Sequence, residues 1–179
     1  NQPNPLKKRE GIIMTSSRKV NKVKLIAYCG LMAAIIAVAT GFIKIPTAIG
    51  YMHIGDGFIF LAAALLGPYG AIAAGIGSGL ADLLAGYYIY IPATFVIKAA
   101  MGLIAAYSLK QGQSVVRCVI TFILAELVML LGYFAFECIL YGIEAAAAVV
   151  ITNSIQGILG VVIGIVAVKL VCNKINPEK

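Results

Sequence analysis

Residues 51–101 are apolar over nearly their whole length, yet they contain four ionisable side chains. These are His53, Asp56, Asp82 and Lys98, which stand among runs of Ala, Gly, Ile and Leu. An ionisable group at the centre of a bilayer costs at least roughly 2.5–3.5 kcal/mol, so it normally faces the protein interior or an aqueous cavity. The stretch therefore predicts membrane-embedded helices that enclose a polar site.

The composition of the whole chain agrees with a membrane location. Apolar residues make up 61% and charged residues 12% of the 179 positions, whereas soluble domains have about 45–50% and about 25%. A chain of this length has room for several spans of roughly 20 residues and for little else. It contains no GxxxxGK[ST] phosphate-binding loop, so any ATP-driven step must come from another chain.

The net charge of +7 is explained by topology better than by a nucleic-acid partner, which we do not expect. Most cations precede the first apolar run, flank a loop in the middle of the chain, or close the chain. An even number of crossings places them on one side of the bilayer, as the positive-inside rule requires. They are Lys7, Lys8, Arg9, Arg18, Lys19, Lys22, Lys24, Lys110, Arg117, Lys169, Lys174 and Lys179.

The four cysteines are far apart and the chain has a single histidine. Metal sites in proteins draw on clusters of such ligands at short spacings. We therefore predict no metal site and no bound cofactor, and interpret the cysteines as small buried apolar residues.

Six apolar segments predict an all-α membrane protein, a six-transmembrane-helix bundle with both termini in the cytoplasm. The segments are 24–43, 55–66, 69–84, 92–109, 115–141 and 145–172. Residues 1–23 form a basic cytoplasmic segment, of which 1–13 are expected to be foreign to the native chain because Met14 begins a plausible native start. Residues 24–172 form the transmembrane substrate-binding domain, and 173–179 form a cytoplasmic tail. The loop 42–54 has the mixed aromatic and polar content of a lid over a site.

The intramembrane polar residues are predicted to gather in the outer half of the bundle. At 1.5 Å of rise per residue, Lys98 lies roughly 9 Å and Glu137 roughly 6 Å below the exterior face. Asn153 and Gln156 lie roughly 12 and 17 Å down, and their spacing of three places them on one helix face. The pattern favours a polar pocket that opens outward. The alternative is a set of internal ion pairs, such as Lys98 with Asp82 or Glu137.

Aromatic side chains near the same depth are candidates for the walls of this pocket. Tyr87, Tyr88, Phe95 and Tyr133 could stack on a ring. The amides of Asn153 and Gln156 offer both hydrogen-bond donors and acceptors, which suits a neutral heteroaromatic ligand. In the first span, Ala33-x-x-x-Ala37 allows close approach of another helix. This helix is either internal or part of a partner subunit, and the spacing does not distinguish the two.

Several motifs together resemble the substrate-binding S component of energy-coupling factor (ECF) vitamin transporters. They are the Ala33-x-x-x-Ala37 pair, His53-Ile54-Gly55-Asp56, Leu66-Gly67-Pro68-Tyr69-Gly70, Ala81-Asp82-Leu83-Leu84-Ala85-Gly86-Tyr87 and Pro92-Ala93-Thr94-Phe95-Val96-Ile97-Lys98. The likeness covers nearly all of the chain after Met14. The pattern is similar to the branch that contains hydroxymethylpyrimidine, pyridoxine and riboflavin carriers.

The resemblance implies a multi-pass protein of the bacterial plasma membrane without catalytic activity of its own. It implies that a transmembrane T subunit and two ATP-binding cassette ATPases supply the energy, with Ala33 and Ala37 facing the T subunit. A small pyridine or pyrimidine alcohol is the first choice of ligand, with riboflavin second. The candidate ligand-binding residues are Tyr51, His53, Tyr88, Phe95, Lys98, Tyr133, Glu137, Asn153 and Gln156.

Two other classes of protein fit the sequence less well. A small intramembrane enzyme would use Glu126, Glu137 or Asp82 as acid or base, but the sequence shows no nucleophile–base pair or metal-ligand set. A channel or an autonomous secondary transporter is disfavoured because the chain carries no inverted repeat of the kind many transporters have.

Overall fold

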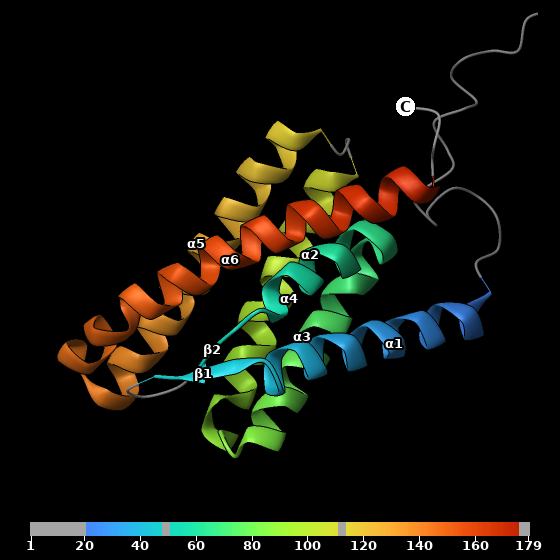
Figure 1. Cartoon of the computed structure of the whole chain (residues 1–179). Helices are drawn as coiled ribbons and strands as arrows, with labels where there is room; N and C mark the ends of the chain where they lie inside the picture. Colours follow the sequence, from blue (N-terminus) through green and yellow to red (C-terminus); the bar gives the residue numbers. More distant parts are fainter. Residues whose placement is uncertain (1–20, 48–50, 111–113, 176–179) are drawn as a thin grey trace, which may run out of the picture.

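The computed structural model describes residues 21–47, 51–110 and 114–175 (Figure 1). The described residues form six α-helices, a two-stranded hairpin and one 3₁₀ turn. In chain order these are α1 (Lys22–Gly41), β1 (Lys44–Pro46), β2 (Tyr51–His53), α2 (Gly55–Leu66), α3 (Pro68–Ala85), η2 (Tyr88–Tyr90), α4 (Ile91–Leu109), α5 (Val115–Tyr141) and α6 (Ile143–Ile175).

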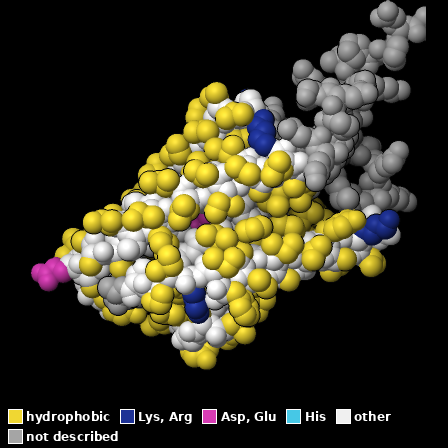
Figure 2. Space-filling view, in the orientation of Figure 1, with side chains coloured by type: hydrophobic (Ala, Val, Ile, Leu, Met, Phe, Trp, Pro, Cys, Tyr) yellow, Lys and Arg dark blue, Asp and Glu magenta, His cyan; other side chains and the backbone are white. Residues whose placement is uncertain are grey.

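These helices confirm an all-α membrane protein with the expected segments. Among the described residues, four stretches are long and apolar enough to cross a membrane, namely Lys22–Gly41, Tyr88–Leu109, Val115–Tyr141 and Ile143–Val171. The outer surface carries few charged side chains over the face shown in Figure 2, and large apolar residues such as Phe42 and Ile139 are 78% and 82% exposed. Such a surface is stable only when lipid covers it.

The six-crossing topology with cytoplasmic termini stays a prediction. The start of α1 and the end of α6 lie at the same end of the bundle (Figure 1), which agrees with an even number of crossings. α6 continues to Ile175, so the helix enters the segment expected to be a tail. Residues 1–20 and 176–179, which include the segment 1–13 expected to be foreign, lie outside the described residues.

The segment 42–54, which the sequence suggests is a lid, contains a β-hairpin that was not predicted. β1 and β2 pair antiparallel, with Lys44 opposite His53, Ile45 opposite Met52 and Pro46 opposite Tyr51. β-branched and aromatic residues suit this pleated surface. The hairpin is therefore a small β element in an otherwise helical protein, and it connects the end of α1 to the start of α2.

Helix α2 lies at the centre of the bundle and contacts α1, α3, α4 and α6. Its Phe60 is fully buried and stacks on Phe122 of α5, with ring centroids 4.0 Å apart and planes at 4°. A left-handed Gly67 (φ 59°) followed by Pro68 turns the chain from α2 directly into α3. Because α2 has only 12 residues, it begins inside the bundle, and its first turn places polar groups there.

Small residues allow α1 and α3 to approach closely. A side chain added at Gly77 of α3 would place its Cβ 2.5 Å from the carbonyl oxygen of Ala33. Ala33 and Ala37 are 6% and 8% exposed, so this pair of alanines is buried inside the chain. The internal-packing alternative is therefore the one that the structure shows, and these residues do not present a surface to a partner in this conformation.

The close contact between α1 and α3 makes Gly77 sensitive to one methyl group. Gly77→Ala should destabilise the protein by about 1–3 kcal/mol, the usual cost of overpacking. Gly30→Ala on α1 is the matched control, since nothing lies within 4 Å of its added Cβ and alanine favours helix by about 1 kcal/mol. The measurement is the thermal unfolding midpoint in detergent. A midpoint for Gly77→Ala at or above that of Gly30→Ala would contradict the packing.

Candidate ligand-binding site

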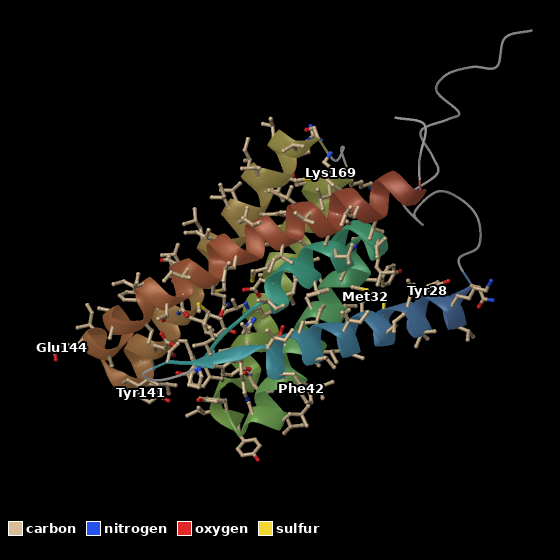
Figure 3. The ribbon with its side chains drawn as sticks, viewed as in Figure 1. Tyr28, Met32, Phe42, Tyr141, Glu144 and Lys169 are labelled. Carbon is tan, nitrogen blue, oxygen red and sulfur yellow. The ribbon has the colours of Figure 1, made fainter. Side chains whose placement is uncertain are left out.

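A cavity lies at the end of the bundle where the hairpin meets the ends of five helices. Phe42, Tyr141 and Glu144 mark this end in Figure 3, and Tyr28 and Lys169 mark the opposite one. The empty space between its walls is about 530 Å³, part of which is open to solvent. Its lining residues are Thr40, Thr47, Tyr51, His53, Ser78, Asp82, Tyr87, Tyr90, Thr94, Tyr133, Glu137, Val149, Asn153 and Gln156.

Tyrosine rings form one part of the wall. Tyr51 of the hairpin and Tyr87 have ring centroids 5.2 Å apart, and Tyr87 and Tyr90 lie 6.0 Å apart in an edge-to-face arrangement. Tyr133 of α5 donates a hydrogen bond of 3.0 Å to Thr94 Oγ1 of α4. These contacts hold flat apolar surfaces around a space of the kind that a heteroaromatic ring fills.

Polar atoms that the protein does not pair line the same space. Tyr51 donates to Asp82 Oδ1 at 2.7 Å, but Asp82 Oδ2 has no partner. Glu137 Oε2, Thr40 Oγ1 and Ser78 Oγ are likewise buried without a hydrogen-bond partner among the described residues. An unpaired buried polar group costs about 1–3 kcal/mol, so these four atoms are the ones that a bound molecule would satisfy.

A buried ion pair lies beneath the cavity. Lys98 Nζ is 2.5 Å from Asp56 Oδ1, and both side chains are fully buried. Lys98 also lies 5.6 Å from the ring centroid of Tyr133. Lys98 therefore forms an internal ion pair, but with Asp56 and not with Asp82 or Glu137, the partners named in the alternative interpretation. The reason is that Asp56, in the first turn of α2, reaches α4 at the level of Lys98, while Asp82 bonds to Tyr51.

The side chain of Gln156 connects this ion pair to the hairpin. Its Nε2 donates to Asp56 Oδ2 at 2.8 Å, and its Oε1 accepts from the backbone N–H of His53 at 3.2 Å. His53 Nδ1 accepts from the N–H of Gly55 at 3.1 Å. In the neutral ring the proton is consequently on Nε2.

Seven of the nine predicted ligand-binding residues lie in or directly beneath this cavity. Six of them line it, and Lys98 lies under its floor. The six are Tyr51, His53, Tyr133, Glu137, Asn153 and Gln156. The other two, Tyr88 and Phe95, are 65% and 43% exposed and are not among the lining residues.

Local geometry explains why these two residues do not line the cavity. Thr94 and Lys98 are four residues apart, are 3% and 0% exposed, and so define the inner face of α4. Phe95 is one residue along and points away from that face. Tyr88 begins the 3₁₀ turn η2 (Tyr88–Tyr90), whose last residue, Tyr90, is the buried one.

Sequence reasoning missed several lining residues as ligand-binding candidates. Asp82 and Ser78 are four apart on α3 and therefore share a face, which is a signal that could have found them. They are joined by Thr40, Thr47, Tyr90, Thr94 and Val149, whereas Tyr87 lines the cavity as expected of a wall residue. Threonine and valine carried no such signal because they are frequent in apolar helices.

Glu126 lies apart from this cavity. It lines a groove between α5 and α6 with Ile123, Leu127 and Gly157, among others. The three carboxylates of the enzyme alternative therefore do not share one site, since Asp82 and Glu137 line the other cavity. Within the part of the chain that the structure describes, no group of three or more His, Cys, Asp or Glu side chains could hold a metal ion.

The fold and the cavity together define a small membrane-embedded protein that can enclose a polar ring at one end of its bundle. Comparison with known families gives the class its name: residues 20–173 match the family described as ECF-type riboflavin transporter, S component. The chain belongs to this family, which confirms the resemblance seen in its motifs. The family is one of transporter components and not of enzymes.

A similar protein is known from Pyrococcus woesei. It is described as "Uncharacterized protein in gap 3'region" and is 37% identical over 123 residues. The match covers 68% of this chain and 82% of the relative.

His53 is on β2, outside the membrane-spanning helices, and its burial makes the protein sensitive to pH. Burial lowers the pKa of His53 to about 4 from its ordinary value near 6.5, with Asp56 opposing the shift and Lys98 adding to it. At pH values between about 4 and about 6.5, the unfolded chain therefore binds a proton at this histidine that the folded chain does not bind. Stability should fall as the pH drops from about 6.5 to about 4, by up to about 3 kcal/mol.

Unfolding in detergent at a series of pH values measures this fall. His53→Asn is the matched variant, because an Asn side chain can still accept the hydrogen bond from the N–H two residues on but does not titrate. The slope between pH 4 and 6.5 should be shallower in His53→Asn, and equal slopes would show that another group controls it.

Proposed function

We propose that this protein captures a vitamin or vitamin precursor with a single heteroaromatic ring at the hairpin end of its bundle. Membership of the S-component family makes it the substrate-binding subunit of an ECF transporter. Release of the ligand to the cytoplasm then requires docking on a T subunit and two ABC ATPases. The protein belongs in this proposal to the plasma membrane of a bacterial cell, with six crossings and cytoplasmic termini.

The observation that supports this proposal is the set of unpaired polar atoms among tyrosine rings. The carboxylate oxygens of Asp82 and Glu137 accept hydrogen bonds, and the hydroxyls of Thr40 and Ser78 donate or accept them. A ligand that suits these atoms presents several donors, such as hydroxyl, amino or ring N–H groups. Pyridine and pyrimidine alcohols carry such groups on a ring small enough to lie between tyrosines.

The full space of the cavity up to its mouth is about 530 Å³, which lies in the range of pockets that hold small molecules. A single ring and the three-ring riboflavin are both of a size that pockets of this range hold. The name of the matching family points to riboflavin, so this vitamin is the direct competitor in any test.

The substrate is best tested by calorimetric titration of the detergent-purified protein with pyridoxine, hydroxymethylpyrimidine, thiamine, biotin and riboflavin. Pyridoxine or hydroxymethylpyrimidine should bind most tightly. If riboflavin binds most tightly, the proposal of a single-ring substrate is wrong, but the transporter role stands. Failure of every vitamin to bind would contradict the proposed capture.

Glu137→Gln should weaken binding by about tenfold or more, since a hydrogen bond to a charged group contributes about 1.5–3 kcal/mol. Glu144→Gln is the matched control, because this exposed carboxylate in the first turn of α6 lies outside the cavity. Equal affinities of the two variants would show that Glu137 does not contribute to ligand binding.

The T subunit is proposed to dock on the exposed side of α1, which also carries small residues. Gly30 and Ala34 are both exposed, unlike Ala33 and Ala37. The pair Gly30→Leu/Ala34→Leu should leave the unfolding midpoint nearly unchanged and reduce co-purification with co-expressed T subunit and ATPases. Ala33→Leu/Ala37→Leu should instead lower the midpoint, because both positions are buried. A stable Ala33→Leu/Ala37→Leu protein that selectively fails to assemble would return the docking role to those alanines.

A further inference from the structure

We infer that the Asp56–Lys98 ion pair is a positioning device for the hairpin that covers the ligand cavity, acting through the amide of Gln156. The inference rests on the proposed function only for its consequence on ligand affinity. Neither Asp56 nor Lys98 lines the cavity, so any effect of this pair on binding must pass through the residues that do.

The connection is a continuous chain of buried contacts. Lys98 Nζ bonds to one oxygen of Asp56, and the other oxygen accepts from Gln156 Nε2 at 2.8 Å. The Oε1 of the same amide accepts from the backbone N–H of His53 at 3.2 Å. Lys98, Asp56, Gln156 and His53 are 0%, 0%, 2% and 8% exposed, so water does not compete for these bonds.

The carboxylate of Asp56 decides which way the Gln156 amide points. An ionised carboxylate accepts hydrogen bonds and cannot donate them. It therefore selects the orientation with Nε2 toward itself and Oε1 toward the hairpin. In the flipped amide, an oxygen would face the carboxylate and an NH₂ group would face the N–H of His53, and both bonds would be lost.

Lys98 keeps Asp56 ionised and in place. Its ammonium compensates the burial of the carboxylate, a burial that would be very costly for an unpaired charge. Lys98 also lies over the ring of Tyr133, a wall residue on α5. The pair thus connects a wall of the cavity to the strand β2 that closes it.

The consequence for binding is that the lid is ordered before the ligand arrives. A lid segment held in its bound position loses less conformational freedom on binding, which raises affinity. His53 is ordered from two sides, because its Nδ1 also accepts from the N–H of Gly55 at the start of α2. Tyr51, two residues before His53 on the same strand, lines the cavity, so the bond at His53 also positions this tyrosine.

Two double variants separate the acceptor role of Asp56 from its charge. Asp56→Asn/Lys98→Met removes both charges but keeps a carbonyl oxygen for Gln156 Nε2. Asp56→Leu/Lys98→Met removes the same charges and also the acceptor, with a side chain of similar size. Both variants avoid a lone buried charge, which single replacements would leave behind.

The first measurement needs no ligand: hydrogen exchange of the backbone amide of His53 in the detergent-solubilised full chain. Exchange in Asp56→Leu/Lys98→Met should be about tenfold faster than in Asp56→Asn/Lys98→Met, on the scale of one hydrogen bond. The second measurement is the affinity for the tightest vitamin of the panel. It should fall about tenfold in the Leu variant relative to the Asn variant.

Equal His53 exchange in the two variants would overturn the inference, whatever their affinities. A difference in exchange with no vitamin bound by the wild-type chain would support the positioning role and reject the proposed function instead. If Asp56→Leu/Lys98→Met does not fold, hydrogen exchange of the His53 amide is measured in Gln156→Met, which lacks the Oε1 acceptor. Exchange there should be faster than in the wild-type chain. Unchanged exchange at His53 in that variant would overturn the inference.

Discussion

The ion pair between Asp56 and Lys98 is the interaction on which the hairpin end of this bundle depends. Both groups are fully buried in a helical bundle whose surface is largely apolar, where an uncompensated charge would be prohibitive. The pair forms because α2 has only 12 residues and begins inside the bundle, so that an acid in its first turn reaches α4. There the carboxylate also lies at the helix N-terminus, where the backbone dipole favours it.

The short central helix in turn requires small residues around it. A Cβ at Gly57 of α2 would lie 2.4 Å from the side chain of Ile163, and one at Gly164 of α6 would lie 2.5 Å from the ring of Phe60. These glycines let α6 lie directly on α2. That contact brings Gln156 within reach of Asp56. The packing of the apolar helices α2 and α6 therefore also determines the geometry of the polar network below the cavity.

The sequence predicted the parts of this fold that depend on local patterns. α5 has the expected bounds of Val115 to Tyr141, because a run of apolar residues between polar ends defines them. The helix rise alone also predicts that Glu137 and Asn153 lie near the same end of the bundle, and both line the cavity. By contrast, the partner of Lys98 depends on the rotation and tilt of α2 against α4. A list of polar residues at similar depths contains Asp56, Asp82 and Glu137 without distinguishing them.

The hairpin and the exposed positions of Tyr88 and Phe95 were missed for related reasons. Two strands of three residues carry too little periodicity to be read from the chain. Rotation about a helix axis decides whether Phe95 faces the cavity or its neighbour Thr94 does, and a shift of one position turns a side chain by about 100°.

The unpaired atoms of the cavity carry a selectivity of their own. Asp82 Oδ2 and Glu137 Oε2 are buried without a hydrogen-bond partner among the described residues, so a molecule that enters the cavity has to supply donors to them and not merely fill space. An apolar ring of the right size would leave both carboxylates buried without partners, which is more costly than leaving the cavity wet. If the protein captures a ring as proposed, the site should reject molecules that lack donors more strongly than it discriminates among those that have them. In that proposal the tyrosines position the ring, and the carboxylates select rings that carry donors.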